Sequence, residues 1–249
     1  MADALPLTAW LLAGLAGIGV GATGVGGVLI VPVLTAVGEM PVHAAIAAAS
    51  FALLFPALAA QCMLSRQASG RGTTGLTAGA LGGAALGALT LPWLPGAAIG
   101  LGVAALATAS GAQALLARGT HASAAKDLPG SAPSFLLGLA VGCASAWSGT
   151  GGALVLLPLL MLLGVEARIA LPLGQTIQLP ITGIASLVNF HAGTLALALG
   201  AALGICLLLG WAGGIALGRT LPGPRLRQLM AVALLAAGLW YGWRVLQGG

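Results

Sequence analysis

The sequence carries very little charge. Of its 249 residues only 5% are Asp, Glu, Lys or Arg, whereas 59% are hydrophobic. A soluble domain of ordinary composition has about 25% charged residues, so this chain has too few to cover a surface in contact with water. The composition therefore excludes a soluble globular protein and indicates one that is embedded in lipid.

Cysteine and histidine are also scarce. Cys62, Cys143 and Cys206 stand singly in hydrophobic stretches, and the three histidines have no metal-ligand spacing. These positions predict neither a disulfide framework nor a metal site. The basic residues behind the net charge of +5 lie in short loops, so we expect no nucleic-acid partner. No cofactor is expected either.

Long hydrophobic runs make up most of the chain. Runs of about 18 or more hydrophobic residues predict membrane-spanning helices. Six runs are continuous: 42–64, 73–92, 95–117, 169–190, 194–218 and 226–246. Two more, 5–38 and 133–164, are interrupted by glycine-rich stretches. The sequence thus predicts an all-α polytopic membrane protein, surrounded by membrane lipid, with 1–249 as a single transmembrane domain.

The basic residues indicate how the chain is threaded. Lys and Arg gather in the cytoplasmic loops of membrane proteins. If the chain starts outside and each interrupted run is a hairpin that returns to its own side, eight of the nine basic residues become cytoplasmic. Only Arg244 then lies outside. If the interrupted runs were single spans, the cluster at 219–227 would be extracellular, so the charges favour hairpins.

The two interrupted runs begin two similar halves. Residues 24–27 match 149–152, and each stretch is followed by a proline and, six residues later, by a glycine. The first repeat is 5–117 and the second is 133–246, with a cytoplasmic linker at 118–132. Each half has one glycine-broken hairpin and three crossings, so the halves enter the membrane in opposite senses. Such inverted-topology repeats are typical of secondary transporters, whose substrate site lies near the midplane.

The glycine-rich stretches predict helix breaks at membrane depth. Backbone that leaves a helix in lipid must be buried in protein or face a polar cavity. Its free N–H groups, and those that begin the next half-helix, form a site for an anion. Neighbouring hydroxyls, including that of Ser145, are expected to add donors. The candidate substrate-binding residues of the two loops are Thr23, Gly24, Gly26, Gly27, Ser148, Gly149, Thr150, Gly151 and Gly152.

Polar residues within the continuous spans extend this candidate site. Polar side chains at membrane depth usually face the protein interior. Ser50 and Thr176 hold matching positions in the two halves, and Gln175 and Gln178 flank Thr176. We expect these four residues to line the substrate path, with hydrogen bonding between helices as the alternative. The same alternative applies to two residues nearer the span ends, Gln61 and Asn189.

Enzyme sites find no support in the sequence. Residues 19–24 spell G-x-G-x-x-G, but that fingerprint binds dinucleotides only within a βαβ unit, which this chain lacks. Ser148-Gly149 resembles a nucleophile turn, yet His43 and His191 stand at span ends and His121 in the linker, so none is placed to serve as its base. We therefore expect no catalytic residue.

Two further glycine series are expected to serve helix packing. They recur every four residues, at Gly79, Gly83 and Gly87 and at Gly210, Gly214 and Gly218. This spacing places each series on one helix face, where small residues let two helices approach closely. For the glycines of the two loops, the alternative to a substrate site is a role in helix packing alone.

The duplicated motif resembles the sulfite exporter TauE/SafE family. It is carried by GVGATGVGGVLIVPVLTAVG at 19–38 and SAWSGTGGALVLLPLLMLLG at 145–164, each followed by a segment with Ser or Thr. The resemblance covers both halves. It implies a multi-pass protein of the bacterial cytoplasmic membrane that exports a small sulfur-containing anion such as sulfite, thiosulfate or an organosulfonate. An anion channel and a membrane scaffold stay open, as do a coupling ion (H⁺ or Na⁺) and the oligomeric state.

Overall fold

The fold is all-helical in the part of the chain that the structure describes. The computed structural model describes residues 5–24, 26–64, 71–116, 128, 130–165, 167–220 and 223–247. These residues form helices and connecting turns, without a strand among them, which confirms the predicted fold class. Most of the predicted linker 118–132 lies outside the described residues, and its last two residues belong to a helix.

Six long helices follow the predicted continuous spans. They are α3 (Val42–Leu64), α4 (Arg71–Thr90), α5 (Gly96–Leu116), α8 (Ala167–His191), α9 (Leu197–Thr220) and α10 (Gly223–Leu246). No boundary differs from the predicted one by more than three residues. A continuous hydrophobic run in lipid has one way to satisfy its backbone, which is to form a helix, so the run length sets the helix length.

Both interrupted runs break at the predicted glycines. α1 (Leu7–Thr23) ends at Gly24 and α6 (Ser131–Ser148) ends at Gly149, with φ of 76° and 66° respectively. Each glycine adopts the left-handed conformation and donates its N–H to the carbonyl four residues back. Four shorter elements follow the breaks: η1 (Gly27–Leu29), α2 (Ile30–Pro32), the π-helical η2 (Val33–Val37) and α7 (Ala153–Leu162).

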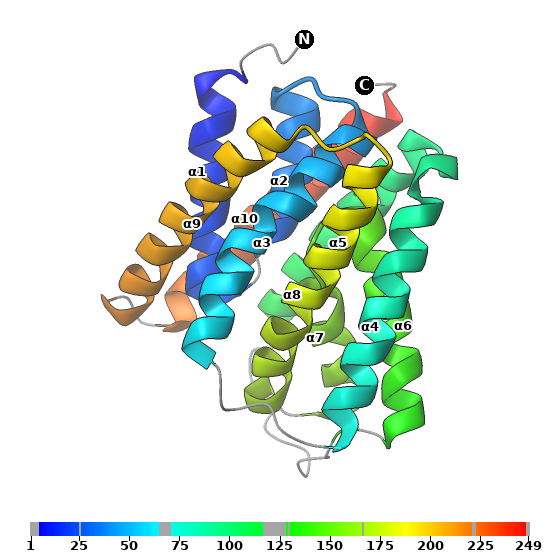
Figure 1. The fold of residues 1–249 in the computed structure, drawn as a ribbon. Coiled ribbons are helices and arrows are strands. Elements are labelled where there is room, and N and C mark those ends of the chain that lie inside the picture. The colour runs from blue at the N-terminus through cyan, green and yellow to red at the C-terminus, as the bar shows by residue number, and fades with distance from the viewer. Residues whose placement is uncertain are drawn as a thin grey trace.

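Hydrophobicity separates α8 from the other long helices. The helices that are long and apolar enough to cross a membrane are α3, α4, α5, α6, α9 and α10. α8 has 25 residues, yet it is not among them, because polar side chains such as Gln175 and Gln178 lower its hydropathy. Figure 1 nevertheless shows α8 running the length of the bundle between α3 and α4.

Each hairpin returns to the end of the molecule from which it enters. In Figure 1, α1 descends from the end that carries both termini, and the segment with α2 rises back to that end. α6 and α7 enter and leave at the opposite end. This arrangement agrees with the predicted hairpins, whereas the inverted-repeat relation and the side of the membrane that each end faces stay predictions.

The first helix of each hairpin packs against a helix of the other predicted repeat. α1 lies along α9, and α6 lies along α4. Their backbones touch: a Cβ added to Gly79 would overlap the carbonyl oxygen of Phe135, and one added to Gly214 would overlap that of Ile18. The packing role predicted for the two glycine series is confirmed except at Gly218, where an added Cβ would lie 3.9 Å from its nearest neighbour.

Buried hydrophobic side chains form two main clusters. The first joins α1, α2, α3, α5, α9 and α10 around residues such as Ile30 and Leu207, and Leu154 of α7 also packs into it. The second joins α4, α6, α7 and α8 around residues such as Leu76 and Ile177. We call these two sets of helices the first body and the second body. They meet where α3 packs against α8 (Figure 1).

Candidate substrate-binding site

The two glycine breaks meet at the boundary between the two bodies. A Cβ built on Gly27 would lie 3.2 Å from the carbonyl oxygen of Thr150. One built on Gly24 would lie 3.0 Å from Nε2 of Gln175, on α8. The structure therefore brings together two loops that are more than a hundred residues apart in the sequence, and it places α8 beside them.

Backbone N–H groups at both breaks have no backbone acceptor. Within the described ranges this holds for Gly26 and Gly27 in the first break and for Gly151 and Gly152 in the second. These amides precede or begin the helical segments that leave the breaks, where the first N–H groups lack intrahelical partners and the helix dipole favours negative charge. None of the predicted site residues is charged, so the site offers neutral donors to an anion.

Both breaks require glycine because neighbouring atoms leave no room for a side chain. A Cβ on Gly26 would overlap the carbonyl oxygen of Ala16, on α1. A Cβ on Gly152 would lie 2.6 Å from Cδ1 of Ile181, and the φ of Gly152 is 103°, which a residue with a side chain rarely adopts. Larger residues would therefore push the loops away from α1 and α8 and separate the amides.

Most of the predicted hydroxyl donors already bond to their own helices. Three of them donate to the carbonyl oxygen four residues back, at 2.8 to 2.9 Å: Thr23, Ser148 and Thr176. A hydroxyl has a single proton to donate, so these groups offer an anion no further donor while those bonds last. Thr150 Oγ1 lies 2.9 Å from Ser148 Oγ and donates to it, because the Ser148 proton is already used.

The hydroxyl of Ser50, unlike those above, makes no hydrogen bond within the described residues. It lies on the face of α3 between Ile46 and Leu53, whose atoms lie next to Gly149 and Gly27 respectively. The Ser50 side chain is only 2% exposed and has no hydrogen-bond partner among the described residues. Its position between the two breaks makes it a donor available to a ligand.

The two glutamines of α8 and Ser145 are similarly unpaired. Gln178 is 3% exposed, and a Cβ on Gly151 would lie 3.2 Å from its Cγ. Gln175 is half-buried beside Gly24. In the described part of the chain neither amide side chain has a hydrogen-bond partner, and the buried Oγ of Ser145 has none either. The unpaired donors thus come from both bodies and surround the contact between the breaks.

A comparison with protein-family models identifies the chain. The model described as "Sulfite exporter TauE/SafE" matches residues 6–243, a range that includes both glycine breaks. The chain belongs to this family. Searches among curated proteins and among solved structures found no match.

TauE/SafE membership gives the general function. The family consists of membrane transporters for sulfur-containing anions such as sulfite, and it is not a family of enzymes. This TauE/SafE protein is therefore a multi-pass membrane transporter for a small anion, and lipid surrounds its apolar helices. The match and the helices agree with the resemblance found in the sequence.

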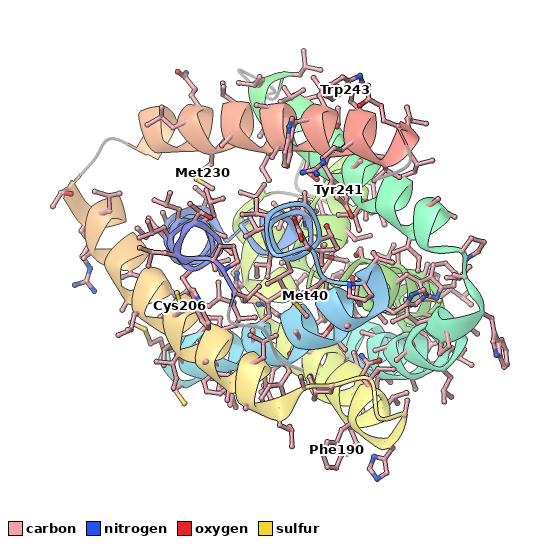
Figure 2. All side chains as sticks on the ribbon, turned by 90° about the horizontal axis from the view of Figure 1, so that it is seen from above. Met40, Phe190, Cys206, Met230, Tyr241 and Trp243 are labelled. Atoms are coloured by element: carbon pink, nitrogen blue, oxygen red, sulfur yellow. The ribbon has the colours of Figure 1, made fainter. Side chains whose placement is uncertain are left out.

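Contacts of α10 in this TauE/SafE protein were not foreseen from the sequence. Figure 2 shows Tyr241 turned from α10 towards the segment with α2, whereas Trp243 points away. The hydroxyls of Tyr241 and Thr35 lie 3.0 Å apart, and Arg244 Nη1 donates to the carbonyl of Ala36 at 2.8 Å. These bonds hold the π-helical η2 near its end, where the last carbonyls of a helix have no intrahelical donor. One feature of the sequence pointed to these contacts: Arg244 is the one basic residue that the predicted topology places outside the cytoplasm.

Proposed function

We propose that this protein exports a small sulfur-containing anion, namely sulfite, thiosulfate or an organosulfonate, across the bacterial cytoplasmic membrane. The anion binds between the two glycine breaks. The observation that carries this proposal is the contact between the breaks, with unpaired N–H groups from Gly26 and Gly27 on one side and Gly151 and Gly152 on the other.

Side chains complete the proposed site. Sulfite, thiosulfate and sulfonates each present several acceptor oxygens, and Ser50, Gln175 and Gln178 each present a donor that the protein leaves unused. Neutral donors bind an anion without a fixed countercharge. A transporter benefits from this, since binding must be favourable enough to admit the ion and weak enough to release it.

Transport by alternating access follows from the place of the site. In secondary transporters a fixed site near the midplane opens to one side and then to the other as two bodies move. Here the breaks meet at the boundary of the first and second bodies, with α1 and α2 on one side and α6 and α7 on the other. A shift of the second body relative to the first changes access to the site and disturbs the first cluster only where Leu154 of α7 joins it.

Flux into proteoliposomes tests the proposal. Purified protein is expected to take up sulfite, thiosulfate or an organosulfonate with saturation, above the rate of empty liposomes. Gln178→Leu is expected to raise the KM by about tenfold, because a hydrogen bond to a charged group contributes about 1.5–3 kcal/mol. Gln61→Leu is the matched control, since Gln61 lies at the far end of α3, eleven residues beyond Ser50; its KM should stay near that of the wild type.

The same assay distinguishes the alternatives. If none of these anions is transported while another class of solute is, the proposed substrate is wrong. Flux that does not saturate, together with single-channel currents, would show an anion channel instead. Imposed H⁺ and Na⁺ gradients, applied separately, show which ion drives the flux, and inside-out vesicles report its direction.

A further inference from the structure

α8 carries a line of polar side chains that starts at the glycine breaks. Gln175, Gln178, Thr182, Ser186 and Asn189 follow one another at intervals of three or four residues. Such intervals place side chains on one face of an α-helix. The last four are nearly fully buried, with exposed fractions of 1–5%. We call these five residues the polar line.

The polar line faces the interior of the molecule. On one side of it, Gly183 packs towards Leu54 of α3, where a Cβ would lie 3.9 Å from the leucine. On the other side, Ala185 packs with Ala88 of α4 and Ala146 of α6. The line therefore lies between the contact of α8 with the first body and its contacts within the second.

One end of the polar line belongs to the proposed site. Nε2 of Gln175 lies beside Gly24, and Gln178 and Thr182 lie beside Gly151. From there the line continues along α8 towards its end at His191. Figure 1 shows that this end of α8 lies at the end of the molecule that carries both termini.

The far half of the polar line contains buried polar atoms with no partner. Oγ of Ser186 and Nδ2 of Asn189 make no hydrogen bond to any described residue. The Thr194 hydroxyl lies 3.1 Å from the backbone carbonyl oxygen of Asn189 and 3.4 Å from its Oδ1, so Nδ2 is the amide atom left without any partner. Buried polar groups are nearly always paired, and hydrogen bonding between helices would have paired these two. Unpaired donors in one conformation are expected where a substrate passes in another.

The matching face of α3 lacks this feature. Ser50 and Thr176 are 126 residues apart, and the same shift relates the first four residues of the polar line to Ala49, Ala52, Pro56 and Ala60. At these four positions α3 therefore packs with apolar side chains alone. Helix packing therefore does not explain why α8 has polar side chains at these positions. Only the second repeat has them.

We propose that the polar line is the half-pathway along which the anion travels between the glycine breaks and the end of the molecule that carries both termini. In the predicted topology that end is extracellular, so the line is the exit for an exported oxyanion. Its burial in this structure corresponds to a closed exit. The proposal rests on the proposed function, which supplies the anion.

Accessibility of an introduced cysteine tests the half-pathway. In a variant without Cys62, Cys143 and Cys206, Ser186→Cys is compared with Ala185→Cys, its buried neighbour on another face of α8. Anionic methanethiosulfonate, added from the outside to protein that is transporting, is expected to label position 186 several-fold faster than position 185 and to stop flux. An organosulfonate substrate should slow the labelling. Equal labelling of the two positions in a protein with normal flux would overturn the proposal.

Flux of a double variant gives an independent readout. Ser186→Val with Asn189→Leu is expected to lower the maximal rate by about tenfold, since it removes two donors from the path, and to leave the KM little changed. A rate equal to that of the wild type would contradict the half-pathway. If the wild-type protein itself moves no sulfur-containing anion, the proposed function fails, and the labelling contrast between 186 and 185 still decides whether the polar line opens.

Discussion

At the scale of single residues, hydrogen bonding distinguishes two hydroxyls that hold matching positions in the two repeats. Ser50 and Thr176 match between the repeats. Thr176 donates to the carbonyl of Pro172 at 2.9 Å, whereas Ser50 has no partner in the described ranges. A threonine in a helix often bonds back to the preceding turn in this way. The first repeat therefore contributes a free hydroxyl at this position and the second does not.

Paired substitutions test this asymmetry. Ser50→Ala is expected to raise the KM for the transported anion by about tenfold, because it removes a donor to a charged ligand. Thr176→Val has nearly the same shape and removes a hydroxyl whose proton is already used, so its KM should change by less than about twofold. Both values come from initial flux rates into proteoliposomes. Equal effects at the two positions would contradict the assignment of Ser50 as the free donor.

At the scale of elements, glycine determines which helices can touch. α1 approaches α9, and α6 approaches α4, so closely that backbone atoms occupy the space where a side chain would be. In lipid the hydrophobic effect does not drive two apolar helices together, so close packing of small residues takes over this role. The recurrence of glycine at every fourth residue predicted a packing face, but it did not predict which helix packs against α4 or α9.

Two neighbouring glycines of α9 provide a matched test. A Cβ on Gly214 would overlap the carbonyl oxygen of Ile18, whereas one on Gly213 would have no atom within 4 Å. Gly214→Ala is expected to destabilise the protein by about 1–3 kcal/mol through overpacking. Gly213→Ala should be neutral or stabilise it by up to about 1 kcal/mol through helix propensity. Thermal unfolding in detergent measures both, and a similar loss for the two variants would rule out the backbone contact.

At the scale of the whole molecule, the packed bodies are not the sequence repeats. α4 of the first repeat belongs to the second body, while α9 and α10 of the second repeat belong to the first. The bodies meet where α3 packs against α8 and where the glycine breaks touch. Relative motion of the bodies, rather than of the repeats, leaves the tight glycine contacts intact, and it is the motion that we expect during transport.

Cross-linking tests which units move. A short thiol-specific linker between Leu54→Cys and Gly183→Cys joins α3 to α8 across the boundary and is expected to abolish flux. The same linker between Ala88→Cys and Ala146→Cys joins α4 to α6 within the second body and should leave flux close to that of the unlinked protein. Both pairs are made without the native cysteines. Normal flux in the linked Leu54–Gly183 variant would show that α3 and α8 do not move relative to each other.

The sequence by itself determined the membrane environment, the helices and the positions of the breaks. These are local properties: lipid requires each hydrophobic run to satisfy its own backbone, and a glycine permits the left-handed turn that ends α1 at Gly24 and α6 at Gly149. The family resemblance rested on the same local motifs. Ser50, Gln175 and Gln178 were also identifiable, as polar residues that lipid would not tolerate on an outer face.

Only the tertiary structure decided which helices pair, which hydroxyls remain free and where the polar line of α8 faces. An apolar helix surface carries little information about its partner, because lipid and another apolar helix are similar surroundings for it. The proton of Thr23 or Ser50 can be assigned only when every nearby acceptor is known. For the same reason Ser186 and Asn189 gain meaning only in three dimensions, where their polar atoms are seen to be buried and unpaired.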